Sequence, residues 1–169
     1  MDQKVYELIN KQINEELYSA YLYMSFANYF DQEGLDGYAN WYMIQAAEER
    51  DHALIFRRYL LDNGRSVKLQ AVAEPTCEFS SFLEPLEAGL EHEKHVTALI
   101  NNIYAAAIEV HDYRTCKFLD WFIDEQGEEE VNAEEMVAKM KLFGEERRAL
   151  YDLNQEYASR KYQAPQQLA

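Results

Sequence analysis

One arrangement of polar residues occurs twice in this chain, and it constrains the fold more than any other feature. Glu16 precedes Glu49 by 33 residues, and Glu93 precedes Gln126 by the same interval, 77 residues further along the chain. Each later member opens a four-residue motif whose ends share one helical face, because residues three apart are neighbours on a helix. The two motifs are Glu49-x-x-His52 and Gln126-x-x-Glu129. The repeat predicts two similar halves, each built from long helices.

Apolar residues at helical spacing extend on both sides of these polar positions. The three prolines and six glycines lie mostly outside the helix-forming stretches, and no segment alternates for long with the period of a strand. Asp2 and Asp36 are candidate N-caps, and Pro85 suits the first turn of a helix. We expect four long helices and a shorter fifth one, with bounds near residues 2–32, 36–62, 83–111, 112–143 and 145–161.

The connection between the second and third helices decides the topology. Residues 63–82 contain Asn-Gly, Glu-Pro and Ser-Ser pairs, and a connection of this length can cross a bundle from end to end. The third helix would then run parallel to the second. The expected fold is all-α: an antiparallel four-helix bundle with one long crossover connection and a short fifth C-terminal helix. A single domain is expected over residues 1–162, and a flexible tail over residues 163–169.

The charge balance narrows the classes of partner. With 31 acidic and 16 basic residues, the formal net charge of −15 disfavours nucleic acid and anionic membrane surfaces and favours cations. Cys77 and Cys116 are widely separated and form no CxxC motif, so we expect neither a disulfide framework nor a thiolate metal site. No export signal and no apolar run of membrane-spanning length is evident. These features predict a cytoplasmic protein with no nucleic-acid or membrane partner.

The ionisable residues on the apolar lines cannot stay charged and unpaired inside a bundle. No lysine or arginine lies on these lines, and a buried unpaired charge costs several kcal/mol. The carboxylates must therefore take up protons or bind cations, and two divalent ions would offset four of them. Carboxylates with one imidazole suit iron or manganese, and zinc less specifically. The residues expected to meet at mid-bundle are Glu16, Glu49, Glu93, Glu129, His52 and Gln126.

Several short motifs recur together along the chain: Glu16-Leu17-Tyr18 with Tyr23, Glu48-Glu49-x-x-His52, Glu93, and Glu125-Gln126-x-Glu128-Glu129. In this combination they resemble the non-haem bacterial ferritins, and the resemblance extends from the first helix through the fifth. It implies an iron-storage protein that assembles as a homo-oligomeric hollow shell of 24 subunits. It also implies a ferroxidase centre, which oxidises Fe(II) to Fe(III) with O2 or H2O2 before ferric mineral is stored.

The resemblance assigns ligands to two iron ions in each subunit. Glu16, Glu49 and His52 would hold the first ion, and Glu49 would bridge to the second. The residues around the second ion would be Glu93, Glu129 and, close by, Gln126. The mismatch between the two motifs implies that one ion is held more firmly than the other.

Four further residues have two interpretations each. Tyr23 would lie beside the centre and hydrogen-bond a ligand, as a tyrosine does in the family, but a packed core tyrosine would fit the sequence equally well. A third iron ion is implied at a site that shares Glu129, yet the same acids are what a solvated acidic face would carry. These outer residues are Glu48, Glu125 and Glu128.

Departures from related families sharpen the assignment. Bacterioferritins, ribonucleotide reductase small subunits and rubrerythrins carry a second Glu-x-x-His motif, where this chain has Gln126-x-x-Glu129. Bacterioferritins also bind haem through a methionine between the glutamate and histidine of the first motif. Arg50 and Asp51 occupy those positions here, so haem is not expected.

Two other functions remain open at this point. A bundle of this kind could hold a fixed zinc or calcium ion without turnover. A peroxide-reducing protein of the rubrerythrin kind would carry a pair of CxxC motifs, and this chain has none. Away from the centre, His92, His95 and His111 fall off the inward line of the third helix and are expected at the surface. Gly127 weakens the fourth helix by about 1 kcal/mol, a break of local propensity that is typical of functional positions.

Overall fold

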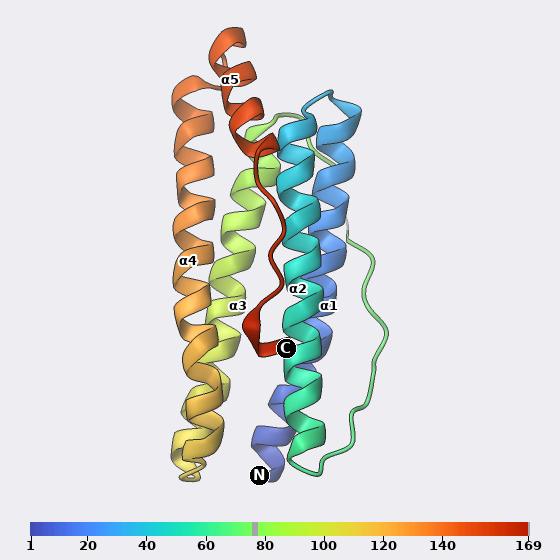
Figure 1. Ribbon diagram of the computed structural model, residues 1–169, viewed down its shortest axis with the longest axis vertical. Helices are drawn as coiled ribbons and strands as arrows, with labels where there is room; N and C mark the ends of the chain where they lie inside the picture. Colours follow the sequence, from blue (N-terminus) through green and yellow to red (C-terminus); the bar gives the residue numbers. More distant parts are fainter. Residues whose placement is uncertain (76–77, 169) are drawn as a thin grey trace.

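The computed structural model describes residues 1–75 and 78–168, so the prediction for Cys77 lies outside the described residues. This part of the chain is helical and contains no strand (Figure 1), which confirms the all-α prediction. None of its helices is both long and apolar enough to cross a lipid bilayer. The elements are α1 (Gln3–Gln32), α2 (Asp36–Asp62), α3 (Leu83–Glu109), α4 (Tyr113–Phe143), α5 (Arg147–Ala158) and the short 3-10 helix η1 (Gln166–Leu168).

The helix ends follow local chemistry, with three differences from the sequence prediction. One is that α3 ends at Glu109, two residues before the expected end. Asp2 caps α1 as predicted, since its side chain accepts a hydrogen bond from the backbone of Lys4. Asp36 is the first residue of α2 instead of its cap. The fifth helix is shorter at both ends than the predicted 145–161. It begins after Glu146, whose side chain caps it, and it ends at Ala158.

The topology is the predicted one. α1 packs chiefly against α2, and α3 packs chiefly against α4, while the chain between α2 and α3 runs along the outside of the first pair (Figure 1). This connection is held part-way by Asn10, whose side chain exchanges hydrogen bonds of 3.0 and 2.8 Å with the backbone of Lys68. The third helix therefore starts at the opposite end of the bundle from where the second one stops.

The apolar core is divided in two by the level of the predicted polar centre. One part fills the end of the bundle that holds the beginning of α1, and the other fills the end where α5 docks. Members of the first are Val5, Ile9, Phe56, Leu60 and Phe122. Members of the second are Phe26, Phe30, Tyr38, Leu86 and Met140. The buried carboxyl groups lie along the helices between these two clusters.

α5 supplies the capping side chain that the start of α2 lacks. Leu35 stands at the N-cap of α2 and offers no side-chain oxygen, but Asn154 Oδ1 accepts hydrogen bonds from the backbone of Gly37 at 2.8 Å and of Tyr38 at 3.3 Å. These are two of the amides that a helix leaves unpaired at its start. The fifth helix thus caps the second one from a distance of more than a hundred residues in the chain.

Replacing Gly37 with alanine is expected to destabilise the protein by about 1–3 kcal/mol, the range for forced overpacking. A Cβ at this position would lie 1.7 Å from the backbone oxygen of Asn154, so α5 would have to move. Gly127→Ala is the matched control, because its Cβ meets no described atom within 4 Å, and it should gain about 1 kcal/mol of helix propensity. Denaturant unfolding of the metal-free protein measures both, and a Gly37 variant as stable as wild type would contradict the docking.

The last residues lie beside the bundle. The chain after α5 turns back and runs along α2, where Gln166–Leu168 forms a 3-10 turn against that helix (Figure 1). This part of the predicted tail, residues 163–168, therefore has a defined place, and its flexibility stays a prediction.

Candidate metal centre

One half of the centre is a tight group of three potential metal ligands. Glu16 comes from α1, Glu49 and His52 come from α2, and each can offer one ligand atom such that all three atoms lie within 4.8 Å of one another. The three side chains are at most 2% exposed. Glu49 and His52 face each other because they are three residues apart on one helix, and His52 Nδ1 lies 3.4 Å from Glu49 Oε2.

Two oxygens of this group lack a hydrogen-bond partner. Gln12 donates to Glu16 Oε1 at 2.9 Å, whereas Glu16 Oε2 and Glu49 Oε2 are buried and accept no hydrogen bond from any described residue. Buried polar atoms are nearly always paired, so an orphaned carboxylate oxygen needs an explanation. A cation bound between Glu16, Glu49 and His52 would satisfy both oxygens, and the donor set of two carboxylates and an imidazole fits iron.

The other half carries its carboxylates on α3 and α4 and is held by neutral donors. Tyr23 donates its hydroxyl proton to Glu93, and Gln126 Nε2 donates to the other oxygen of Glu93 at 3.1 Å. Gln45 Nε2 donates to Glu129 Oε2 at 2.7 Å. The two carboxylates are buried, but they lie outside the tight group of three. Gln126 therefore positions Glu93 in this structure.

Burial makes the four carboxyl groups reluctant to ionise. It is the main cause that raises the pKa of Glu16, Glu49 and Glu93 above the ordinary value of 4.5, and the charge of Glu49 further raises the pKa of Glu16. Burial, followed by the charge of Glu93, raises the pKa of Glu129 to about 8. Burial therefore favours the neutral, protonated form of these groups, and a divalent ion would displace the protons.

Two glutamines that support the carboxylates are not among the site residues predicted from the sequence. Gln12 and Gln45 each precede a predicted ligand by four residues, one helical turn before Glu16 and Glu49 respectively. A buried polar residue one turn from a ligand on the same face is the signal that could have revealed them.

Tyr23 is buried among the aromatic residues of the core and also donates to Glu93, one of the predicted ligands. Replacing Tyr23 with phenylalanine would leave a Glu93 oxygen without its donor, and the metal-free protein should lose about 1–3 kcal/mol. Tyr38→Phe is the matched control, because the Tyr38 hydroxyl is buried with no partner among the described residues and its loss should be nearly neutral. Denaturant unfolding compares the two, and equal effects would contradict the assigned role.

The three outer acids are not grouped as metal ligands in the described part of the chain. Glu48 is partly buried, Glu125 is half-buried and Glu128 is exposed. Glu48 has an unforeseen partner in Arg160, whose Nη2 lies 2.7 Å from Glu48 Oε2. No basic residue lies on the apolar lines, as the sequence indicates, but this arginine reaches the flank of the centre from the segment after α5.

The prediction that His92 lies at the surface was wrong. His92 is half-buried, its Nε2 lies 2.7 Å from Ser19 Oγ, and its ring meets the edge of the Tyr23 ring at a centroid distance of 5.8 Å. Burial, with a smaller contribution from His95, lowers its pKa to about 4. His95 and His111 are exposed, as predicted.

Comparison with known proteins agrees with this geometry. The ferritin-like domain family matches residues 6–143 of the chain. The chain belongs to the ferritin family. This ferritin is 36% identical over 162 residues to the bacterial non-heme ferritin of Staphylococcus saprophyticus, an alignment that covers 96% of this chain and 97% of the relative. The corresponding protein of Staphylococcus aureus is also 36% identical, with 98% of its length covered.

Solved structures show the same similarity. An engineered closed form of the Archaeoglobus fulgidus ferritin superposes with a TM-score of 0.94 at 42% identity, covering 96% of this chain and 99% of that one. The open-pore ferritin of the same archaeon gives a TM-score of 0.93 at 43% identity, with 95% and 99% of the two chains covered. The helical bundle described above is therefore that of the family, and the fold prediction is confirmed.

Proposed function

We propose that this ferritin stores iron and is a ferroxidase, oxidising Fe(II) to Fe(III) with O2 or H2O2 at a two-iron centre within each subunit. The observation that carries the proposal is the pair of orphaned oxygens of Glu16 and Glu49 beside His52. A buried group of this kind must hold protons or bind a cation, and its two carboxylates and one imidazole suit iron.

Each residue has a role in holding the iron, which is the substrate. Glu16, Glu49 and His52 hold the first ion, and Glu49 bridges to a second ion bound by Glu93 and Glu129. Gln126 and Tyr23 orient Glu93. Two Fe(II) ions held side by side lose one electron each, which matches the two-electron reduction of O2 to peroxide or of H2O2 to water.

The two rival functions differ from the proposed one in the ligands that they need or in the product that they leave. A fixed structural zinc would not need a second set of buried carboxylates on α3 and α4. Zinc prefers four tetrahedral ligands in structural sites, and the tight group offers three. Peroxide reduction without storage is separated from the proposed function by the mineral, which only a storage protein accumulates.

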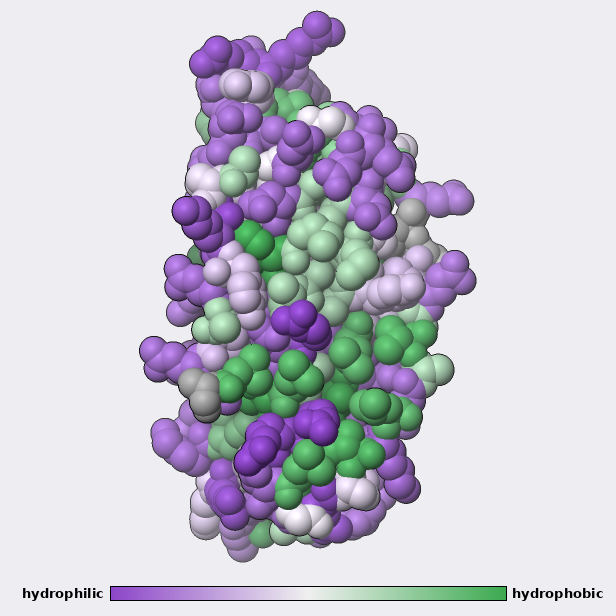
Figure 2. Space-filling model, turned by 45° about the vertical axis from the view of Figure 1, so that its right-hand side comes forward, coloured by the Kyte–Doolittle hydropathy of each residue, from purple (hydrophilic) through white to green (hydrophobic). Residues whose placement is uncertain are grey.

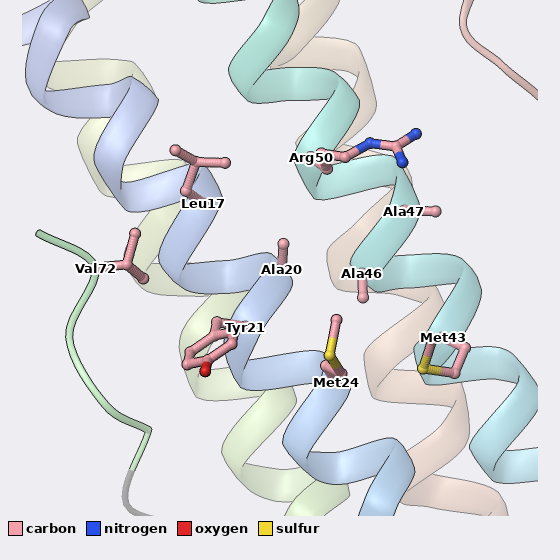
Figure 3. Close-up of a pocket in the computed structure, with 9 residues that line it drawn as sticks. All are labelled: Leu17, Ala20, Tyr21, Met24, Met43, Ala46, Ala47, Arg50 and Val72. Carbon is pink, nitrogen blue, oxygen red and sulfur yellow. The ribbon is translucent and has the colours of Figure 1, made fainter. Parts of the chain in front are cut away.

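Assembly into a shell of 24 subunits is part of the proposal. Hydrophobic residues gather on the face that Figure 2 displays. In this view the side of Figure 1 that carries α1 and the crossover connection is turned toward the viewer. An open groove of about 520 Å³ lies between α1 and α2, with Val72 of the connection at its edge (Figure 3). Exposed apolar side chains such as Tyr21, Met24 and Met43 line it, and surfaces of this kind are typical of subunit contacts.

The cytoplasm is the proposed compartment, because two lone cysteines suit a reducing environment.

Size-exclusion chromatography after aerobic loading with Fe(II) tests the proposed function. The expected species elutes near 24 times the subunit mass of 19.9 kDa and turns amber as ferric mineral collects. A small colourless species would contradict storage and favour a metal-binding bundle. Consumption of H2O2 without mineral would favour the peroxide-reducing rival.

A further inference from the structure

The chain after α5 is fastened along the bundle at the level of the centre. We call residues 159–168 the strap; in Figure 1 it descends between α2 and α4. Asn40 Nδ2 donates to the backbone oxygens of Tyr157 and Arg160 at 3.1 Å each. Further down, the Tyr162 hydroxyl donates to the buried carboxylate of Asp51. These side chains come from α2, so the strap lies in a fixed register against that helix.

Arg160 makes the contact closest to the centre. Its guanidinium lies over the ring of Trp41, 4.0 Å from the centroid, while Nη2 donates to Glu48 Oε2 at 2.7 Å. Nη1 donates to Gln45 Oε1. The planar guanidinium thus bridges a carboxylate and an amide, a geometry that an ammonium group would not reproduce.

Gln45 transmits this contact to the centre. Because its oxygen accepts from Arg160, its nitrogen faces the other way and donates to Glu129 Oε2 at 2.7 Å. Arg160 therefore fixes which end of the amide points at a carboxylate of the second half. It also provides the positive charge beside Glu48, one of the acids expected at a third iron site.

The strap forms one wall of a partly open chamber next to these residues. The chamber has a volume of about 420 Å³ and is lined on one side by residues of the bundle and on the other by the strap. His52 reaches it from the tight group, and Glu48 and Glu125 face it from α2 and α4. A cation that leaves the centre by the His52 side therefore meets Glu48, which is already paired with Arg160, and Glu125.

We propose that Arg160 is the resident counter-cation of Glu48. Resting on the proposed function, this means that a third metal ion binds at Glu48 and Glu125 only if it displaces the guanidinium. The wild-type subunit then binds two ions, and the strap keeps the outer acids as a passage for iron instead of a resting place.

Calorimetric titration of the metal-free protein with Zn(II), which does not change oxidation state, tests this without relying on turnover. Wild type should bind two ions per subunit. Arg160→Gln should bind a third, with an affinity roughly tenfold to a hundredfold above any third ion in wild type, the range for a lost charged hydrogen bond. Arg160→Met repeats the test with a long apolar stem that can still cover Trp41.

Two controls identify the site at which the third ion binds. Lys161→Gln removes the same charge one residue further on, from an exposed side chain, and should bind two ions as wild type does. Adding Glu48→Gln to Arg160→Gln should abolish the third ion. Equal counts and affinities in wild type and both Arg160 variants, whether two ions or three, would overturn the inference. Failure of wild type to bind two ions would instead contradict the proposed function.

Discussion

Glutamine in place of Glu49 is expected to abolish the fast phase of Fe(II) oxidation and, at the same time, to stabilise the metal-free protein. Both proposed ions lose a ligand. The rate should therefore fall by at least about a hundredfold, which is the upper end of the loss seen when a residue that only hydrogen-bonds to a metal ligand is replaced. The same change removes a buried carboxyl whose Oε2 has no hydrogen-bond partner. It also removes the group whose charge raises the pKa of Glu16, so the metal-free protein should melt at a higher temperature.

Stopped-flow absorbance after addition of Fe(II) measures the rate, and differential scanning calorimetry measures the melting temperature. Glu91→Gln is the control, since Glu91 is an exposed acid on α3 and its loss should change neither quantity appreciably. A Glu49 variant that oxidises iron at the wild-type rate would refute the assigned centre. A variant that loses both oxidation and stability would indicate a structural role alone.

The second large effect is a loss of stability of the metal-free protein as the pH rises from about 5 to about 8. In the unfolded chain a glutamate ionises near its ordinary value of 4.5, whereas the folded protein holds the pKa of Glu129 at about 8. Between these values the folded state binds more protons, so each rise in pH favours unfolding. A change of one in the pKa is worth about 1.4 kcal/mol, so Glu129 alone accounts for a loss on the order of 4 kcal/mol.

Thermal unfolding at several pH values, with and without Zn(II), measures this effect. The ion should remove most of the loss, because it stabilises the ionised carboxylates that the bare protein cannot accommodate. Glu129→Gln should reduce the dependence of the stability of the metal-free protein on pH, and Glu16, Glu49 and Glu93 should account for the part that remains. Stability that stays constant or increases over this range would show that the carboxyl groups are not held in their neutral form.

The helices and the main site residues could be predicted because their signals are local or repeat in the sequence. α1 begins after Asp2 and ends at Gln32 as expected, since a capping side chain and a glycine mark its limits. Glu16, Glu49 and His52 come together because each stands at the middle of an apolar line, and helical geometry turns such lines inward. The metal count and the roles of the outer acids stay predictions.

The remaining contacts depend on residues that are distant in the chain and lie in no repeat. Nothing in the sequence near Glu48 predicts its contact with Arg160. This arginine lies more than a hundred residues later in the chain and carries the positive charge that the apolar lines lack. Ser19 of α1 similarly lies within hydrogen-bond distance of His92, although the position of His92 on its own helix predicts an exposed side chain. Periodicity assigns a face to a residue on one helix, but it does not describe what the next segment places over that face.

The contact of Asn154 with the start of α2 also bears on the order in which the chain acquires its structure during synthesis. Because the amides of Gly37 and Tyr38 receive their partner from α5, the first turn of α2 lacks that partner until α5 has left the ribosome. Trp41 and Gln45, which hold Arg160, lie directly after that turn. A nascent chain can therefore assemble the Glu16, Glu49 and His52 group before the surroundings of Glu48 and Glu129 are finished.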